Sequence, residues 1–180
     1  MGSGKTTLLK RIIEKYSDSA KIGIIQNEFA PANIDGAELK KTGRNFHLLE
    51  IKNGSVFCVC LMGSFSRSLE KFIEDVQPEV IIIESSGLSD TTSVAEVISL
   101  GTLSGKIYLA SNWCIVDAIN FSKVGLQKQR VVHQLRMADV VVINKTDLIK
   151  GKTESSKNEI KSINPFTEIK EATFCNIDFN

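Results

Sequence analysis

Apolar residues recur along the chain in two patterns, and the spacing of each pattern predicts a different element. Apolar positions three and four apart, as in KTTLLKRIIEKY at 5–16, predict amphipathic helices, whereas unbroken apolar runs such as 80–83 predict buried strands. The predicted helices are 5–16, 66–76, 91–100, 124–138 and 154–164, the last ending before Pro165. The predicted strands are 21–28, 79–87, 106–118 with a break near 111–112, 139–147 and 167–174.

The order of these elements predicts an α/β fold. Strands without polar alternation are buried on both faces, which is typical of a mostly parallel sheet with helices on both faces. The stretch 29–65 is rich in Gly, Asn and Ser and shows no clear period. Irregular stretches of this length are usually functional or mobile.

Size and composition favour one ordinary globular domain. The chain has 180 residues, of which 42% are hydrophobic and 24% charged. A net charge of +1 gives no reason to expect a nucleic-acid or membrane partner. No apolar run approaches the roughly 20 residues that cross a bilayer, and no signal-like segment is present, so we expect a cytoplasmic chain.

The first motif, GSGKTT, matches the second half of the phosphate-binding pattern G-x-x-x-x-G-K-[ST]. Main-chain N–H groups of such a loop and of the following helix bind phosphate oxygens. The Thr6 hydroxyl would bind Mg²⁺ and Lys5 would reach the β- and γ-phosphates. The predicted phosphate contacts are Gly2, Ser3, Gly4, Lys5, Thr6 and Thr7. A plain Gly-Ser leader running into a helix is the alternative interpretation.

The second motif is Asn144-Lys145-Thr146-Asp147, which follows the apolar run VVVI. The spacing N-K-x-D after a strand is the guanine-binding pattern of GTPases. The Asp147 carboxylate can accept two hydrogen bonds from the N1–H and amino groups of guanine, a donor pair that adenine lacks. Lys145 would pack its stem over the base and brace the phosphate loop. By itself the motif also fits a polar strand-to-helix turn.

The third motif, Glu84-Ser85-Ser86-Gly87, follows the apolar run at 80–83. A carboxylate at the end of such a strand can hold Mg²⁺ through water, and the Gly87 N–H can contact the γ-phosphate and move when it leaves. Lys5, Glu84 and Gly87 are therefore the predicted catalytic residues. A strand-ending turn is the alternative.

Cys58 and Cys60 would face one way on an extended segment, and two thiolates can share a Zn²⁺ ion. Two ligands do not close a zinc site, so a pair of reduced thiols remains the alternative. The other chemistry-bearing residues carry weaker signals. His47 and His133 are predicted to be structural, Trp113 and Cys114 to lie in the core, and Cys175 to lack a partner in the sequence.

Taken together and in this order, the motifs resemble the CobW-type GTPases, a family that includes metal chaperones. The resemblance extends over nearly the whole chain. It includes GSGKTTLL, IIQNEFAPANIDGAEL (24–39), ESSGLSD (84–90), WCIVDA (113–118), QLRMADVVVINKTDL (134–148) and INPFTEI (163–169).

This resemblance implies a three-layer P-loop NTPase fold and slow, Mg²⁺-dependent GTP hydrolysis coupled to a metal ion, Zn²⁺ or Co²⁺. It assigns Asn144, Lys145 and Asp147 to guanine, and suggests Glu28, beside Asn27 in the first switch, as a metal ligand. The implied partners are GTP or GDP, a metal ion and a client metalloprotein, with a homodimer as one assembly.

Three departures from the family pattern bear on this interpretation. The family motif G-C-x-C-C corresponds here to GSVFCVC (54–60), which keeps two cysteines. The family's first strand and first loop glycine would precede Met1, and its C-terminal domain would follow Asn180, so residues 1–180 are expected to form the GTP-binding domain alone.

The rival interpretations are a non-hydrolysing nucleotide- or metal-binding module, a P-loop kinase or ATPase, and a thiol redox sensor.

Overall fold

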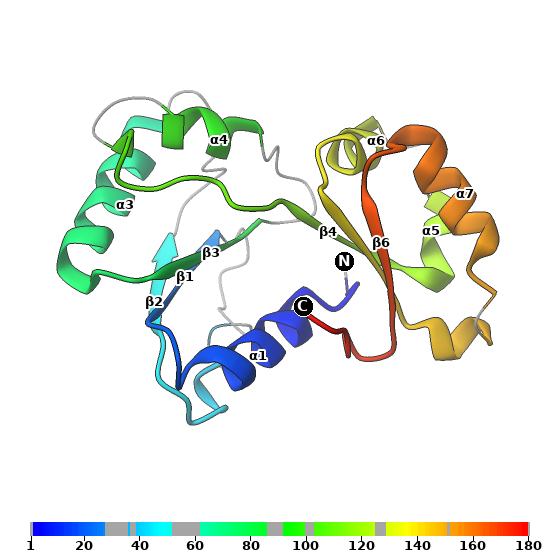
Figure 1. Ribbon diagram of the computed structural model, residues 1–180, viewed down its shortest axis with the longest axis horizontal. Coiled ribbons are helices and arrows are strands. Elements are labelled where there is room, and N and C mark those ends of the chain that lie inside the picture. The colour runs from blue at the N-terminus through cyan, green and yellow to red at the C-terminus, as the bar shows by residue number, and fades with distance from the viewer. Residues whose placement is uncertain are drawn as a thin grey trace. The chain divides into compact units, whose positions relative to one another are not determined.

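The computed structural model describes residues 2–27, 36, 39–51, 62–85, 92–99, 103–124, 129–150 and 152–179. The chain divides into two compact units (Figure 1): unit 1 comprises Met1–Leu8 and Ala110–Asn180, and unit 2 comprises Leu9–Leu109. The helices are α1 (Lys5–Tyr16), α3 (Met62–Val76), α4 (Thr92–Ser99), α5 (Ala118–Val124), α6 (Gln129–Arg136), α7 (Glu154–Ile163) and the 3₁₀ helix η3 (Thr146–Ile149). The strands are β1 (Ile22–Asn27), β2 (His47–Ile51), β3 (Val80–Glu84), β4 (Trp113–Asp117), β5 (Val140–Asn144) and β6 (Glu168–Ala172).

All strand pairs in the described residues are parallel. Unit 2 holds a three-stranded sheet in the order β2-β1-β3, and unit 1 holds another in the order β4-β5-β6. The predicted α/β class with parallel strands is therefore confirmed. Among the described helices, none has both the length and the apolar character needed to cross a membrane.

The sheet of unit 2 is covered on both faces, as its unbroken apolar strands require. Ile22 and Ile24 of β1 point to one face, where they pack against Leu9 and Ile13 of α1. The next residue, Ile25, points to the opposite face and packs against α3, as expected from the two-residue period of a strand. Figure 1 shows α1 and α3 on opposite sides of these strands.

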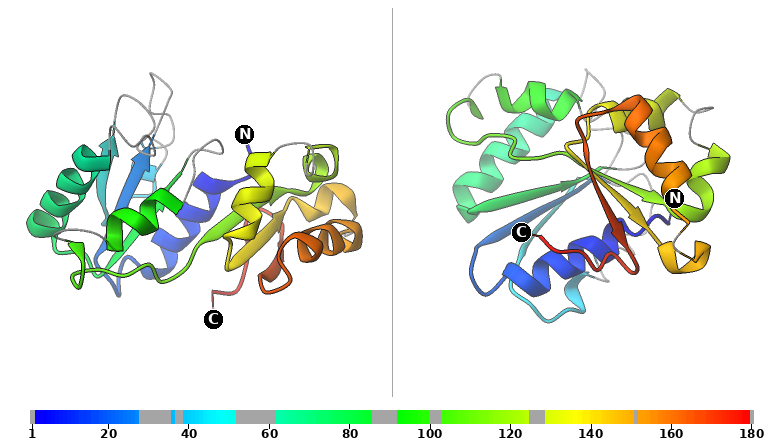
Figure 2. Two further views of the ribbon diagram at one scale, coloured as in Figure 1. Left: turned by 90° about the horizontal axis from the view of Figure 1, so that it is seen from above. Right: turned by 45° about the vertical axis from the view of Figure 1, so that its right-hand side comes forward.

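The sheet of unit 1 follows the same rule. Val141 and Ile143 of β5 pack against α5, α6 and α7, which Figure 2 shows in yellow-green to orange. Val140 and Val142 face the other way, toward a smaller cluster that includes Ile177 from the segment after β6. All five residues of β5 are buried, so this strand is the centre of unit 1.

The sequence patterns missed several of the described elements, among them β2, α5 and η3. The short strand β2 lies inside the stretch predicted to be irregular, and its five residues HLLEI include two polar ones and so give a weak period. The helix α5 begins at Ala118 and shares only residue 124 with the predicted helix 124–138, which corresponds to α6. The reason is local: the Asp117 carboxylate accepts the main-chain N–H groups of Ile119 and Asn120 and so caps the new helix.

The predicted strand 106–118 was too long. Of these residues only Trp113–Asp117 joins a sheet; Ile107 makes an isolated bridge with Ser104, and Tyr108 and Leu109 are exposed. Strand β4 begins after Asn112, whose N–H and side-chain amide bond to the Asp139 carboxylate and the Met137 carbonyl instead of a neighbouring strand. Trp113 is half-buried and stacks on Phe179 with ring centroids 6.2 Å apart.

Asn164 provides a test of this fold. It is buried, its amide nitrogen lies within 3.2 Å of the carbonyls of Leu135, Arg136 and Ala138, and its oxygen accepts the Phe166 N–H. Replacing Asn164 by Ala leaves these carbonyls without their side-chain donor. We therefore expect urea unfolding to report a loss of about 2–3 kcal/mol in the free energy of unfolding. The exposed Asn158 on α7 is the matched control, and Asn158→Ala is expected to change stability by less than about 0.5 kcal/mol. Equal effects of the two substitutions would contradict this role.

Candidate nucleotide site

The candidate site in unit 1 lies at one edge of its sheet. Asp117, Asn144 and Ala172 are the last residues of β4, β5 and β6, and they pair with one another in the parallel register. The three segments that follow these strands therefore leave the sheet at the same edge. In open α/β sheets, ligands bind beyond the carboxyl ends of the strands.

The Asn144 side chain joins two of these segments to the phosphate-loop motif. It is 2% exposed, and its Nδ2 donates to the Ser3 carbonyl over 2.8 Å. Its Oδ1 accepts the main-chain N–H of Cys175 over 2.9 Å. One buried amide thus ties together the loop before α1, the end of β5 and the turn after β6.

Gly4 is required by this close approach. Its φ is +110°, and a Cβ built on it would lie 2.3 Å from Asn144 Nδ2 and 3.0 Å from the Cys175 sulfur. The Gly4 carbonyl accepts the Leu8 N–H in the first turn of α1 and the Cys175 thiol over 3.3 Å. Cys175, for which the sequence offered no partner, is therefore fully buried against the loop.

Lys145 pairs with Asp117, a contact that the motif alone did not indicate. Its Nζ lies 2.7 Å from Asp117 Oδ2, and the same carboxylate accepts N–H groups from Ile119 and Asn120. Burial raises the pKa of Asp117, but the Lys145 ammonium and these donors outweigh it and hold the pKa below its ordinary value. The brace on the phosphate loop thus comes from Asn144, while the Lys145 ammonium binds the end of β4.

The turn at Lys145 brings Asp147 to the surface. Lys145 has a left-handed backbone, with φ +66°, and η3 begins directly after it. The Thr146 hydroxyl bonds to the Ala172 carbonyl and lies 3.2 Å from the Thr173 hydroxyl, which fixes this turn against the end of β6. The Asp147 side chain is exposed beside that junction, where a ligand has access to its carboxylate.

Glu84 lies at the end of β3 in unit 2, where its strand neighbour is Gln26 of β1. Gln26 is 4% exposed, and its Nε2 donates to Glu84 Oε2 over 2.7 Å. Within the described residues the Gln26 Oε1 has no hydrogen-bond partner. A buried acceptor without a donor costs about 1–3 kcal/mol, so this end of β1 and β3 favours a bound water or another donor. Gln26 carries no signal in the sequence, because a lone polar residue in a strand is not a motif.

Four predicted site residues, Glu28, Cys58, Cys60 and Gly87, lie outside the described residues. In the part of the chain that is described, no three His, Cys, Asp or Glu side chains gather in a way that could hold a metal ion. His47 and His133 are both exposed. Cys114 is half-buried beside the core of unit 1, and burial raises the pKa of its thiol to about 11 despite the nearby Lys5 charge.

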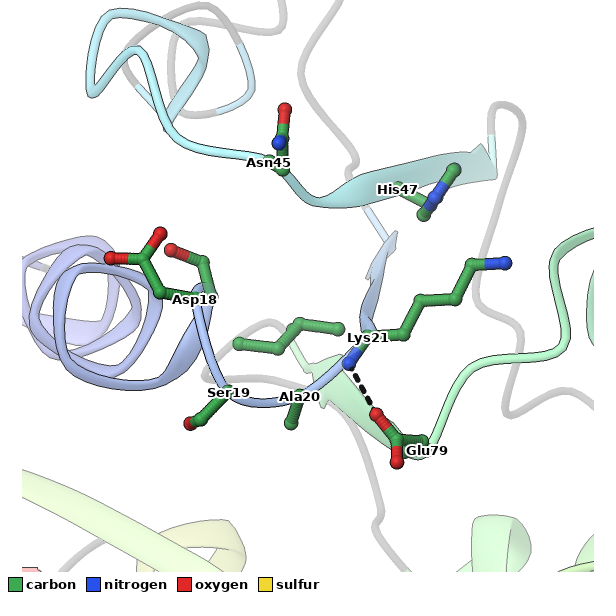
Figure 3. A pocket seen from close by; sticks show the side chains of 9 residues that line it. Asp18, Ser19, Ala20, Lys21, Asn45, His47 and Glu79 are labelled. Atoms are coloured by element: carbon green, nitrogen blue, oxygen red, sulfur yellow. Dashed lines mark hydrogen bonds between the residues drawn. The ribbon is translucent and has the colours of Figure 1, made fainter.

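A cavity of about 350 Å³ in unit 2 lies at the other end of the strands (Figure 3). It is lined by residues 17–22, Asn45, His47 and Glu79, which precede or begin β1, β2 and β3. The Glu79 carboxylate accepts the main-chain N–H of Lys21 there, as the dashed line in Figure 3 shows. Because ligands of parallel sheets bind at the carboxyl edge, we assign this hollow no part in the candidate site.

A parallel α/β unit with a glycine loop and an N-K-x-D turn at one sheet edge defines the class of P-loop nucleotide-binding proteins. The family model described as "CobW/HypB/UreG, nucleotide-binding domain" matches residues 1–171. The chain therefore belongs to the CobW/HypB/UreG family, which confirms the resemblance seen in its motifs.

Individual relatives agree with this assignment. The "Zinc chaperone CobW" of Sinorhizobium sp is 28% identical over 176 residues, which cover 83% of this chain and 49% of the relative. The "Zinc-regulated GTPase metalloprotein activator 1" of Saccharomyces cerevisiae is 29% identical over 208 residues, covering 98% of this chain and 48% of the relative. The chain thus spans about half the length of these curated relatives.

Solved structures share the fold. The Zn(II)-bound YjiA GTPase from E. coli has a TM-score of 0.71 at 22% identity, covering 99% of this chain and 57% of that one. The hydrogenase maturation factor HypB from Archaeoglobus fulgidus has a TM-score of 0.64 at 21% identity, covering 96% and 76% of the two chains.

The Asp117–Lys145 pair predicts a specific pH dependence. The folded chain lowers the pKa of Asp117, so its ionised form stabilises the fold above the ordinary carboxyl pKa, and this contribution is lost as the pH falls through the folded value. We expect Asp117→Asn to cost about 1–3 kcal/mol at pH 7. The difference from the unsubstituted chain should shrink between about pH 5 and pH 3.

Urea unfolding at a series of pH values measures this difference. Glu154→Gln is the control, because that carboxylate is 81% exposed although it also contacts a lysine. A difference for Asp117→Asn that stays constant from pH 7 to pH 3 would show that the charge of Asp117 is not what stabilises the fold.

Proposed function

We propose that this chain is the GTP-binding part of a GTP-dependent metallochaperone. It binds GTP with Mg²⁺, hydrolyses it slowly and couples the nucleotide state to a cysteine metal site. The observation that carries the nucleotide half of this proposal is the buried Asn144 amide, which bonds to both Ser3 and Cys175. That bridge joins the phosphate motif to the guanine motif, whose residues are more than 130 positions apart in the sequence.

The phosphates would bind at the loop before α1. Gly2 and Gly4 have positive φ, so the loop turns tightly into the helix, and its N–H groups together with the helix N-terminus favour anions. Lys5 supplies a positive charge for the β- and γ-phosphates. Lys5, Glu84 and Gly87 are the proposed catalytic residues, acting through charge stabilisation and positioning of the phosphoryl group.

The oxygen donors of this chain fit a hard divalent cation. The Thr6 hydroxyl would bind Mg²⁺ directly and Glu84 through water, in keeping with the preference of Mg²⁺ for oxygen ligands and retained waters. The Gln26 amide that donates to Glu84 would hold this carboxylate in one orientation. The cation, when bound, neutralises charge that develops on the transferred phosphate.

The base would bind beside Asp147. The exposed Asp147 carboxylate would accept hydrogen bonds from the guanine N1–H and amino groups. The ion pair with Asp117 holds the Lys145 side chain in place. The Asn144 amide is buried and the Lys145 ammonium is paired with Asp117. Asp147 is therefore the residue of this motif that recognises the base.

Support for the metal half comes from the residues Cys58, Cys60 and Glu28 and from relatives named as zinc chaperones. We propose that they hold Zn²⁺ or Co²⁺ as cargo for a client metalloprotein in the cytoplasm. Two thiolates and one carboxylate leave a coordination position open, which suits an ion that is passed on.

The base assignment is tested by Asp147→Asn. An amide at this position mismatches guanine but complements xanthine, so we expect GTP affinity to fall by about 100-fold or more and xanthosine triphosphate to become the preferred ligand. Competition of the two nucleotides for the protein measures this, and Asp178→Asn, which changes another exposed carboxylate of the same unit, is the control. A substituted chain that still prefers GTP would show that Asp147 does not read the base.

The metal assignment is tested by replacing Cys58 and Cys60 together with Ser. Loss of both thiolates is expected to weaken Zn²⁺ binding by at least about 10- to 100-fold, measured by competition with a chromogenic chelator. Cys114→Ser is the matched control. GTP turnover measured with and without Zn²⁺ separates a coupled GTPase from a non-hydrolysing binding module, because only the former changes its rate with the metal.

A further inference from the structure

The turn after β6, which contacts the turn that carries Asp147, exposes a large apolar side chain. Phe174 is 70% exposed, and both Phe174 and Cys175 have left-handed backbones, with φ +50° and +52°. Residues other than glycine rarely adopt this conformation, and when they do they often belong to functional sites.

Contacts on both sides hold this turn in place. On one side the Thr173 hydroxyl lies 3.2 Å from the Thr146 hydroxyl. On the other, the Cys175 N–H donates to Asn144 and its thiol to the Gly4 carbonyl. The exposure of Phe174 is therefore imposed by a fixed turn and does not result from a loose chain end.

The same contacts join the turn that carries Phe174 to the turn that carries Asp147. Asn144 and Ala172 are register partners, and Thr146 bonds to the Ala172 carbonyl just beyond them. Phe174 and Asp147 each follow a member of the tied pair Thr146–Thr173 by one residue, and both are exposed. Phe174 offers an aromatic face and Asp147 a carboxylate at the same edge of the sheet.

We propose that Phe174 is a binding residue that stacks on the purine base of the nucleotide held by Asp147. The proposal deepens the proposed function and rests on it. Stacking recognises the face of a base and not its edge, since every base has a π-face. Phe174 therefore strengthens binding without choosing between purines, whereas Asp147 makes that choice.

Phe166 provides a matched control within the same unit. It is 95% exposed and lies before the amino end of β6, at the opposite edge of the sheet. We expect Phe174→Ala to weaken GDP binding by about 10- to 100-fold and Phe174→Tyr to restore it, while Phe166→Ala changes nothing. Binding of inorganic tripolyphosphate, which has no base, should be the same in all four chains.

A spectroscopic readout separates stacking from a structural role. In a Trp113→Phe background, Phe174→Trp places the single indole at the proposed site, and GDP should quench its fluorescence, whereas Phe166→Trp should show no change. If the chain binds GDP but Phe174→Ala behaves like Phe166→Ala and the indole is not quenched, the stacking role is wrong and the GTP site stands. If the unsubstituted chain binds no guanine nucleotide, the proposed function fails together with the role of Phe174.

Discussion

The candidate site of unit 1 depends on one buried amide, that of Asn144. Its Nδ2 donates to the Ser3 carbonyl and its Oδ1 accepts the Cys175 N–H. Two loops that are far apart in the sequence are therefore bonded to one side chain. The bond to Cys175 is buried and the bond to Ser3 is partly buried, and a buried polar group without a partner is costly. The amide therefore fixes the geometry of both loops at once.

The apolar strand behind this amide makes it possible. All of β5 is buried between β4 and β6, so the strand cannot shift its register without moving apolar side chains to the wrong face. The polar groups begin where this strand ends. Asn144 faces the phosphate motif, Lys145 turns the chain and pairs with Asp117, and Asp147 emerges at the surface. Each side chain of the motif thus has a separate task.

Strong apolar periods made most of the fold predictable from the sequence. The helices at 5–16 and 154–164 and the buried run before Asn144 were found nearly to their ends. The short β2 was missed because five residues with polar members carry little period. The start of α5 was missed because it depends on a cap by Asp117 and not on apolar spacing.

The motifs located the candidate site, but not its internal contacts. The sequence suggested that Lys145 braces the phosphate loop, whereas the structure gives that brace to Asn144 and pairs Lys145 with Asp117. Gln26 and Cys175 carried no local signal at all. Their roles depend on residues that are 58 and 171 positions away, which no short pattern can relate.

Because glycine has no Cβ at position 4, Gly4 limits which sequences can adopt this fold. The volume that a methyl group would occupy at residue 4 is already filled by the end of the Asn144 amide. The two positions therefore compete for one space. A chain with a larger residue at position 4 must carry a shorter one at 144 and must find another donor for the carbonyl of residue 3, so changes at these two distant positions are expected to occur together.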